Sequence, residues 1–346
     1  MEETVKAILK NLYDLNVSAL RQNKRGWQNI VYEVETDTAD FIMRCTPKAN
    51  RGKEDILGEA EWLLHLKNHL EVPSPVATIQ NNYCIDLEDT STPYYFVLFD
   101  KIEGQHISYN SYLNRPELFY KLGVEIGKVH ANSRDFTLKR GTRRQWHDNQ
   151  YLQEFGQHIP KNQIKVYESC ALLVEEIKKA TEGSCDYGLV HGDIHHENFL
   201  FNEDRLIIID YDESQYSLLC EDFSVALYYT LYGMLNNNGQ RDKIAKEFCY
   251  HFQLGYKEQF SDACDLSFVP LYLRLRELIA YVGAYKKWDF DHLSAWQAGF
   301  LQESRQRIEN HQPIFQFQEN KWSFYAEVGE YKQTWEREMM GFEEQQ

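Results

Sequence analysis

The sequence predicts an α+β fold with two lobes: a small N-terminal lobe with an antiparallel sheet and a helix, and a large C-terminal lobe that is mostly helical. Three observations support this prediction. Extended runs separated by turn residues occur before residue 100, apolar residues recur at helical spacing after Gly104, and one non-helical segment near residues 191–210 interrupts those helices. A chain of 346 residues suits two domains of roughly 150 residues each. We place the two lobes at residues 1–100 and 101–346.

The small lobe is predicted to begin with a helix and then to form the sheet. Val5, Ile8 and Leu9 recur at helical spacing, and Asp37–Asp40 contains the polar, turn-forming residues of a hairpin. Pro73 prevents the second helix from continuing. A sheet of about five strands is expected, which is a usual size. The expected elements of the lobe are a helix at 3–14, strands at 30–36 and 41–45, a helix at 54–69 across the sheet, and strands near 83–87 and 94–99.

The large lobe is predicted to be helical except around its central segment. Asn236–Gly239 indicates a loop. The tail from Pro313 onward, which is rich in Glu, Gln and aromatic residues, could add a helix against the large lobe. Apolar periodicity predicts six helices, near residues 116–131, 163–180, 221–235, 241–256, 268–286 and 291–310.

The residues from His191 to Leu200 carry the side chains with the clearest chemistry. Asp193 and Asn198 are five residues apart, as are the Asp and Asn of a kinase catalytic loop, and Asp210 ends the apolar strand Leu206–Ile209. A hydroxyl group that attacks a phosphoryl group needs a carboxylate that orients it and accepts its proton, and Mg²⁺ needs hard oxygen ligands. The spacing therefore indicates a phosphoryl-transfer site with Asp193 as the catalytic residue and with Asn198 and Asp210 as the metal ligands.

The loop His-Gly-Asp-x-x-x-x-Asn, with the Ile-Asp that ends the next strand, resembles the aminoglycoside phosphotransferase family, which has a bilobal protein-kinase-like fold. Within that family the chain looks most like the branch with type II homoserine kinase-like and stress-response kinase-like proteins. The resemblance implies a cytoplasmic kinase that uses ATP, or GTP, with Mg²⁺. Supporting segments occur in the family's order at Phe41–Arg44, Glu59–Trp62, Val72–Pro75, Tyr94–Gly104 and Leu122–His130.

The resemblance leaves the acceptor of the phosphoryl group open. A small molecule with a hydroxyl group is expected: an amino alcohol, an amino acid, an aminoglycoside or a sugar. The alternatives are a protein Ser/Thr kinase of the stress-response type and a catalytically silent kinase-like binding protein. The net charge of −16 slightly favours a cationic acceptor, although excess surface carboxylates usually serve solubility.

The resemblance also implies how the small lobe would hold the nucleotide phosphates. The basic residue of the third strand is Arg44, where kinase-like proteins use a lysine, and an arginine differs from lysine in reach and geometry. Its expected helix partner is Glu59, with Glu61 as the alternative, and the glutamate without this role is expected to be exposed.

Two further segments are expected to contact the nucleotide. The phosphate-covering loop falls at Arg25–Asn29, with Gly26 as its single glycine. The hinge between the lobes falls at Leu98–Ile102, where Phe99, Asp100 and Ile102 would offer backbone groups to the base.

Other polar residues near the loop have less specific expectations. His191 is expected to organise the loop through hydrogen bonds from its ring, because the adjacent Asp193 already supplies a base. His195 and Glu197 could face the acceptor or lie on the surface. Asp212 could support the metal site or meet a cationic group of the substrate, and Asp222 indicates a helix cap or a structural brace.

The composition excludes several other classes of protein. A charge of −16 argues against nucleic acid and anionic membranes as partners, because both select basic surfaces. The N-terminus lacks the pattern of a signal peptide, and no apolar run approaches the roughly 20 residues that span a bilayer. Seven cysteines without regular spacing indicate reduced thiols in a cytoplasm.

A different metal chemistry was considered for the same loop. Gly192–His195 matches the first block of metallophosphatases, but the two further blocks that such a site needs do not occur after residue 195. A zinc site that uses the three histidines of the loop lacks a recognisable motif for its fourth ligand. Neither pattern competes with the set of Asp193, Asn198 and Asp210.

Overall fold

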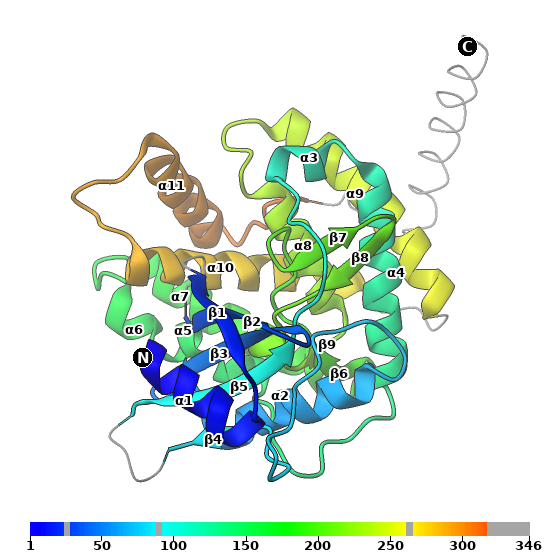
Figure 1. Ribbon diagram of the computed structural model, residues 1–346. Helices are drawn as coiled ribbons and strands as arrows, with labels where there is room; N and C mark the ends of the chain where they lie inside the picture. Colours follow the sequence, from blue (N-terminus) through cyan, green and yellow to red (C-terminus); the bar gives the residue numbers. More distant parts are fainter. Residues whose placement is uncertain (24–27, 88–91, 261–265, 317–346) are drawn as a thin grey trace.

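The computed structural model describes residues 1–23, 28–87, 92–260 and 266–316. It contains a five-stranded antiparallel sheet with helices in its N-terminal part and a mostly helical C-terminal part (Figure 1), so the prediction of an α+β fold is confirmed. Gly26 and most of the tail after Pro313 lie outside the described residues. Within the described ranges, every helix is too short or too polar to traverse a lipid bilayer.

The small-lobe sheet has the strand order β1-β2-β3-β5-β4. The predicted hairpin joins β2 and β3, and in its turn Thr36 Oγ1 accepts the backbone N–H groups of Thr38 and Ala39 at 3.2 and 3.1 Å. The sequence did not indicate β1, because none of its side chains is fully buried and polar residues interrupt it. The strands are β1 (Val17–Asn23), β2 (Ile30–Thr36), β3 (Asp40–Pro47), β4 (Ile85–Asp86) and β5 (Tyr94–Asp100).

The two faces of the sheet have different partners because side chains alternate along each strand. Met43 and Cys45 on β3 are fully buried in a cluster with the apolar side of α1 (Glu2–Tyr13). Arg44 lies between them and therefore points to the opposite face. On that face, Phe99 of β5 belongs to the core that the small lobe shares with the large lobe. The alternation thus directs Arg44 toward the space between the lobes.

The helix α2 (Lys53–Leu66) is attached to the large lobe along one side. The fully buried indole of Trp62 donates to Ser133 Oγ at 2.8 Å. The carboxylate of Glu61 accepts the backbone N–H groups of residues 139, 140 and 141 at 2.8, 2.9 and 3.2 Å. The expectation that one glutamate of α2 is simply exposed is therefore wrong, because Glu59 is buried and Glu61 holds a loop of the large lobe.

The same loop touches α2 backbone to backbone. A Cβ atom on Gly58 would lie 2.1 Å from the carbonyl oxygen of Thr142, and one on Gly141 would lie 2.1 Å from the amide nitrogen of Gly58. Since only glycine fits at both positions, the loop approaches α2 more closely than side chains normally allow.

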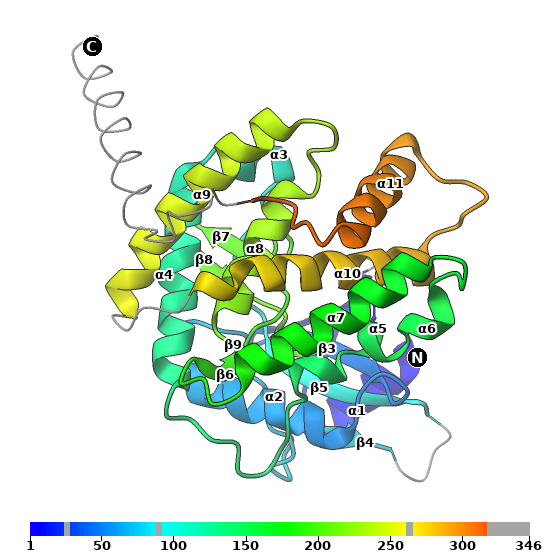
Figure 2. The ribbon, with the colours of Figure 1, turned by 180° about the vertical axis from the view of Figure 1, so that it is seen from behind.

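The large lobe contains all six predicted long helices, and α10 runs through its middle between α7, α8 and α11 (Figure 2). The short helices of the described residues were not predicted as separate elements: they are α3, α5, α6 and the 3-10 helices η1 (Trp146–Asp148), η2 (Tyr211–Glu213) and η3 (Leu266–Phe268). The α-helices are α3 (Tyr109–Leu113), α4 (Pro116–Ser133), α5 (Gln150–Gln153), α6 (Phe155–His158), α7 (Ile164–Thr181), α8 (Cys220–Leu231), α9 (Asn238–Gln259), α10 (Val269–Lys287) and α11 (Ala295–Glu309).

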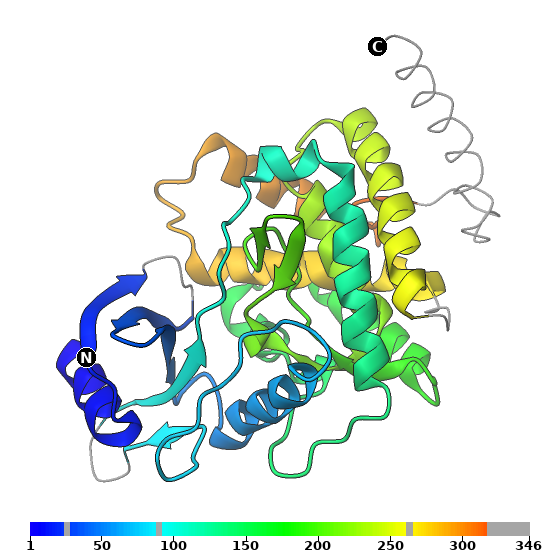
Figure 3. The same ribbon diagram turned by 45° about the vertical axis from the view of Figure 1, so that its right-hand side comes forward.

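Two small antiparallel sheets interrupt these helices where the sequence predicted a non-helical segment (Figure 3). One pairs β6 (Tyr187–Val190) with β9 (Gln215–Leu218), and the other pairs β7 (Phe199–Asn202) with β8 (Arg205–Ile208). The loop 191–198 leaves β6 and enters β7, and the segment 209–214 leaves β8 and enters β9. The two segments that carry the candidate catalytic residues therefore start and end on paired strands.

Replacing Gly58 by Ala is expected to destabilise the protein, although Ala is favoured over Gly by about 1 kcal/mol inside a helix. The new methyl group would overlap the backbone of Thr142, and we expect the free energy of unfolding in urea to fall by roughly 2 kcal/mol. Gly239→Ala in α9 is the matched control, because no heavy atom lies within 4 Å of a Cβ atom there. Equal effects of the two substitutions would contradict the close contact at α2.

Candidate active site

The loop 191–198 is attached to a buried carboxylate of α8. Asp222 is fully buried and accepts the backbone N–H groups of His191 at 2.9 Å and of Gly192 at 2.7 Å. Nε2 of His130, on α4, lies 3.1 Å from the same carboxylate. Burial alone would raise the pKa of Asp222, but the hydrogen bonds from His130 and the loop outweigh it and lower that pKa. Of the two expectations for Asp222, the structure shows the brace.

His191 connects the loop to the end of β8. Its fully buried ring places Nε2 3.0 Å from the carbonyl oxygen of Ile209 and Nδ1 3.3 Å from the backbone nitrogen of Asp193. These contacts fit a neutral imidazole that donates from Nε2 and accepts at Nδ1, and burial lowers the pKa of His191 accordingly. The ring therefore holds two parts of the site together, which agrees with the organising role expected for it.

Gly192 makes the turn between His191 and Asp193 possible. Its backbone is left-handed, with φ 76°, and a Cβ atom there would lie 2.9 Å from the carbonyl oxygen of Glu213. A larger residue would meet both the backbone strain and the contact. The glycine of the His-Gly-Asp motif is thus explained by space and by backbone conformation.

Asp193, Asn198 and Asp210 come together because the loop and the strand are joined at this point. The backbone N–H of Ile209 donates to the carbonyl oxygen of Asn198 at 2.9 Å, which extends the pairing of β7 and β8 by one residue. Nδ2 of Asn198 lies 3.2 Å from Oδ2 of Asp193. Asp210 follows with a left-handed backbone, φ 63° and ψ 70°. The end of the loop therefore lies beside Ile209 at the end of β8, with Asp210 as the next residue.

Asp210 lies in an unfavourable environment for a lone anion. The surrounding protein and the charge of Asp212 raise the pKa of Asp210 to about 7, and Arg44 offsets only part of this effect. A divalent cation would stabilise the ionised carboxylate. No group of three His, Cys, Asp or Glu side chains in the described ranges could hold a metal ion by itself. Asn198 and Asp210 could therefore hold Mg²⁺ with phosphate oxygens and water as the remaining ligands.

Asp193 is paired with an arginine that the sequence analysis did not identify. Nη2 of Arg276, on α10, contacts Oδ1 of Asp193. The same nitrogen donates to the hydroxyl group of Tyr229 at 2.7 Å, and the guanidinium lies 4.6 Å above the ring of Tyr229. Burial alone would raise the pKa of Asp193, but Arg276 and His195 hold it well below its usual range. The carboxylate stays ionised, which suits a group that accepts a hydrogen bond from a hydroxyl group.

On the small lobe, β3 brings Arg44 to Glu59 of α2 in a buried, two-point ion pair. Nη1 lies 2.8 Å from Oε1 and Nη2 lies 2.5 Å from Oε2. The guanidinium lies 5.0 Å from the centre of the Phe99 ring. Its Nε has no hydrogen-bond partner within the described residues. Burial alone would lower the pKa of Arg44, but the charges of Glu59, Asp212 and Asp210 outweigh it and raise that pKa.

In the segment after β5, one residue has backbone groups that are free to contact the base of a nucleotide. The backbone N–H of Asp100 donates to the carbonyl oxygen of Ser74 at 2.9 Å, and that of Lys101 donates to Asp40 at 3.2 Å. Neither backbone group of Ile102 makes a hydrogen bond to another described residue. Of the expected hinge, Ile102 could therefore offer both a donor and an acceptor, while the N–H group of Asp100 is already used.

Asp212 lies between the lobes and is buried. Its Oδ2 accepts Nδ2 of Asn29 at 3.1 Å and lies 3.5 Å from Nη2 of Arg51. The neighbouring Glu213 accepts from Arg51 and, at 3.0 Å, from Nε2 of Gln28. All these partners belong to the small lobe. This position favours support of the site around Asp210 over contact with a cationic group of the acceptor.

His195 and Glu197 lie on the other side of the loop. Nε2 of His195 is 3.4 Å from Oδ2 of Asp193, and its ring centre is 5.1 Å from that of Tyr229. Glu197 is exposed, and its charge raises the pKa of Tyr232 in addition to the larger effect of burial. Both residues therefore remain candidates for contact with the acceptor.

Three arginines that shape the site were not predicted from the sequence. Besides Arg276 and Arg51, the buried Arg143 donates to the carbonyl oxygens of Asp55 at 2.8 Å and of Asp212 at 2.5 Å. The partners named above are between 47 and 162 positions away in the chain. One feature of the sequence could have pointed to Arg276: it lies in Leu273–Leu278, where arginines interrupt the apolar residues of a predicted helix.

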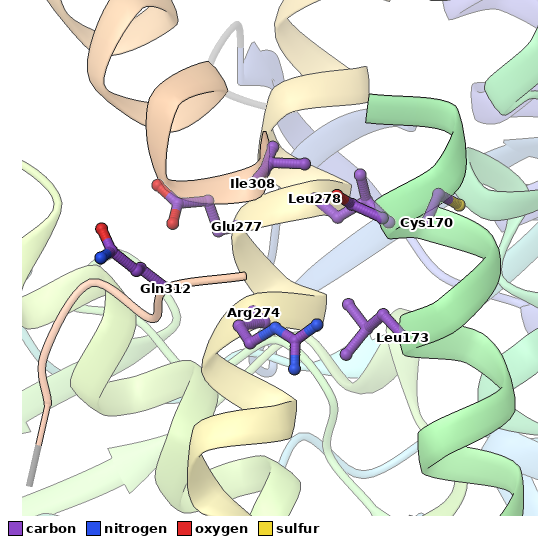
Figure 4. A pocket seen from close by; sticks show the side chains of 8 residues that line it. Cys170, Leu173, Arg274, Glu277, Leu278, Ile308 and Gln312 are labelled. Atoms are coloured by element: carbon purple, nitrogen blue, oxygen red, sulfur yellow. The ribbon is translucent and has the colours of Figure 1, made fainter. Parts of the chain in front are cut away.

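A small hollow borders another face of α10 (Figure 4). Its charged side chains are already paired: Arg274 with Glu176 at 2.9 Å, and Glu277 with Arg307 at 2.7 Å. No residue of the loop 191–198 lines it, so it is separate from the candidate active site. The lining residues are Ser169, Cys170, Leu173, Arg274, Glu277, Leu278, Ile308 and Gln312.

Comparisons with known proteins identify kinases that are similar to this chain. The chain is 28% identical to amicoumacin kinase of Bacillus subtilis (strain 168) over 295 residues. The aligned residues cover 84% of this chain and 87% of that protein. An amicoumacin kinase solved with AMP-PNP, Ca²⁺ and Ami has a TM-score of 0.83 and 26% identity, covering 94% of this chain and 96% of that chain. A microcompartment-associated aminopropanol kinase has a similar fold, with a TM-score of 0.71 and 19% identity, and the match covers 90% of this chain and 100% of that chain.

The match to a protein family covers most of the chain. Residues 19–254 match the family described as the phosphotransferase enzyme family, and this range includes Asp193, Asn198 and Asp210. The similarity to solved kinases confirms the bilobal kinase-like fold. The chain therefore belongs to the phosphotransferase enzyme family, as the resemblance of its loop 191–198 predicted.

Proposed function

We propose that this protein is a kinase that transfers the γ-phosphoryl group of ATP to a hydroxyl group of a small molecule and requires Mg²⁺. The proposal rests on the convergence of Asp193, Asn198 and Asp210 where the loop meets β8. A related amicoumacin kinase was solved with AMP-PNP and Ca²⁺. That complex supports a nucleoside triphosphate and a divalent metal ion as ligands of this chain.

In this proposal the small lobe, residues 1–100, holds the nucleotide. Arg44, kept in place by Glu59, would contact the phosphates, and the loop around Gly26 would cover them. Ile102 would contact the base through its free backbone groups. The large lobe, residues 101–346, would supply the catalytic loop and the acceptor site.

Asn198 and Asp210 would bind the metal ion, because an amide oxygen and a carboxylate are ligands that Mg²⁺ prefers. The ion, when bound, would neutralise charge on the phosphates of the nucleotide. The raised pKa of Asp210 supports this assignment, since the protein alone does not stabilise the ionised carboxylate.

Asp193 would accept a hydrogen bond from the hydroxyl group of the acceptor and take its proton as the phosphoryl group is transferred. Arg276 fixes the carboxylate from one side and keeps it ionised. Because the transition state of phosphoryl transfer is largely dissociative, the orientation of the hydroxyl group matters more than the strength of the base.

Replacing Asp193 by Ala is expected to lower kcat by ~10²–10⁴-fold while the Kd of Mg-ATP changes little, because Asp193 would contact the acceptor. The measurements are ADP release with a panel of small hydroxyl compounds, a Ser/Thr peptide for comparison, and calorimetry with Mg-ATP. Asp204→Ala, at an exposed position of the β7–β8 turn, is the control. Undiminished turnover after the Asp193 substitution would refute the assignment.

Replacing Asp210 by Asn is expected to raise the Mg²⁺ concentration for half-maximal ADP release by at least ~10-fold. The amide keeps the shape of the side chain but offers less negative charge to a cation. Glu203→Gln, an exposed residue between β7 and β8, should leave the requirement unchanged. If both variants need the same Mg²⁺ concentration as the parent protein, Asp210 is not a metal ligand.

Replacing Arg276 by Gln is expected to lower kcat by ~10²-fold with an unchanged KM for ATP, because a displaced catalytic group loses its alignment with the reacting atoms. Arg276→Lys should recover only part of the rate, since lysine has one terminal nitrogen, whereas the guanidinium places Nη2 against Asp193 and Tyr229 and Nη1 3.3 Å from the carbonyl oxygen of Gly192. Arg274→Gln is the control on the same helix, because Arg274 pairs with Glu176. Similar kinetics for both glutamine variants would show that Arg276 does not position Asp193.

A further inference from the structure

A row of aromatic side chains leads from the catalytic loop to the beginning of α11. The ring centres are 5.1 Å apart between His195 and Tyr229, 5.3 Å apart between Tyr229 and Tyr232, and 5.6 Å apart between Tyr232 and Trp296. We call these four side chains the aromatic row. They come from the loop (His195), from α8 and the residue that follows it (Tyr229 and Tyr232), and from α11 (Trp296), so only the tertiary fold brings them together.

The row begins at the candidate catalytic carboxylate. His195 lies 3.4 Å from Asp193 through Nε2. The hydroxyl group of Tyr229 accepts a hydrogen bond from Arg276, whose guanidinium also contacts Asp193. A molecule whose hydroxyl group lay at Asp193 would therefore have the rings of His195 and Tyr229 as its next neighbours.

The other end of the row is open to solvent. Trp296 is 37% exposed, although its ring stacks on the buried ring of Phe300 with centres 5.6 Å apart. Tyr229 and Tyr232 are only partly buried. Large aromatic side chains contribute much to a core when fully buried, and partly open ones that converge on a polar catalytic group are typical of a ligand site.

Neighbouring contacts hold the row in place. Tyr109, on α3, donates from its hydroxyl group to the carbonyl oxygen of Thr230 at 2.7 Å, and its ring centre lies 6.1 Å from that of Tyr232. A Cβ atom on Gly233 would lie 2.9 Å from the Tyr109 ring. Both α3 and α11 lie near the top of Figure 1, away from the small-lobe sheet. The helices that carry Tyr109 and Trp296 thus lie away from the small-lobe sheet.

We infer that the aromatic row binds the acceptor, and that the acceptor is an elongated hydroxyl compound with a flat unsaturated ring far from its hydroxyl group. This inference rests on the proposed kinase activity. An amino alcohol with four heavy atoms in line reaches about 4 Å, which is less than one step of the row. Such a molecule would leave Tyr232 and Trp296 uncovered, whereas a longer one could stack its ring on them.

The position of Trp296 in the chain fits a role in selecting the acceptor. The match to the phosphotransferase enzyme family ends at residue 254, so α11 lies outside the matched range. Nucleotide-binding and catalytic residues, by contrast, lie inside it. The distal end of the row therefore belongs to a part of the chain that can differ without altering the shared catalytic machinery.

The test measures binding of a series of amino alcohols to the protein saturated with Mg²⁺ and ADP, by calorimetry. Each compound carries a naphthyl group on a methylene linker that spans one, two or three steps of the row, and alkyl compounds of equal carbon number control for general hydrophobicity. We expect the longest aryl compound to bind at least ~10-fold more tightly than the shortest, as for aromatic stacking elsewhere. Trp296→Ala should abolish this preference, and Trp296→Phe should retain part of it.

Phe290→Ala is the matched control, because Phe290 is 43% exposed and packs on Tyr285, away from the row. The inference is overturned if the parent protein shows no preference for ring or length, or if Trp296→Ala keeps the preference. A lower melting temperature of Trp296→Ala with an intact preference also overturns it, since the rings would then only attach α11 to α8. Failure of the parent protein to bind Mg-ATP would instead reject the proposed kinase activity.

Discussion

The position of Asp193 depends on the buried carboxylate of Asp222. That group accepts two backbone N–H groups of the catalytic loop and contacts His130 on α4. An uncompensated buried charge costs several kcal/mol, so the arrangement requires all three contacts. The first turn of α8, which contains Asp222, adds the favourable end of a helix dipole. The loop can therefore adopt its shape only after α4 and α8 have packed, and its key residue is one that would touch neither substrate.

A second constraint concerns the nucleotide side. Because Trp62, Glu61 and Gly58 attach α2 to the large lobe, the Arg44–Glu59 pair joins the sheet to a helix that is packed against the large lobe. Arg51 adds a second connection to Asp212 and Glu213. Any movement of the sheet against the large lobe must stretch these buried contacts. The phosphate side of the site is thus organised by packing, and it does not depend on a swing of the helix that carries the glutamate.

Local patterns in the sequence were sufficient for much of this structure. The β2–β3 hairpin and the long helices follow from turn residues and apolar periodicity, and the spacing of Asp193, Asn198 and Asp210 was enough to predict that they meet. The sequence could not show which glutamate of α2 pairs with Arg44, since Glu59 and Glu61 face different sides of the helix and the choice depends on how α2 lies on the sheet. Arg276 was missed because its partner is 83 positions away, and β1 was missed because it is a half-exposed edge strand with no apolar face.

The net charge of −16 does not describe the surroundings of Asp193. Arg276 already compensates this carboxylate, and acidic groups on the surface are screened beyond about 8–10 Å. The exposed Glu197 is a weak partner for a cation, because an exposed ion pair contributes roughly 0–1 kcal/mol. An ammonium group on the acceptor would therefore add less binding free energy than the net charge of the protein suggests. Covering the rings of Tyr229, Tyr232 and Trp296 stabilises a complex by about 25 cal/mol per Å² of apolar surface, so shape and ring content should govern the choice of acceptor more than its charge.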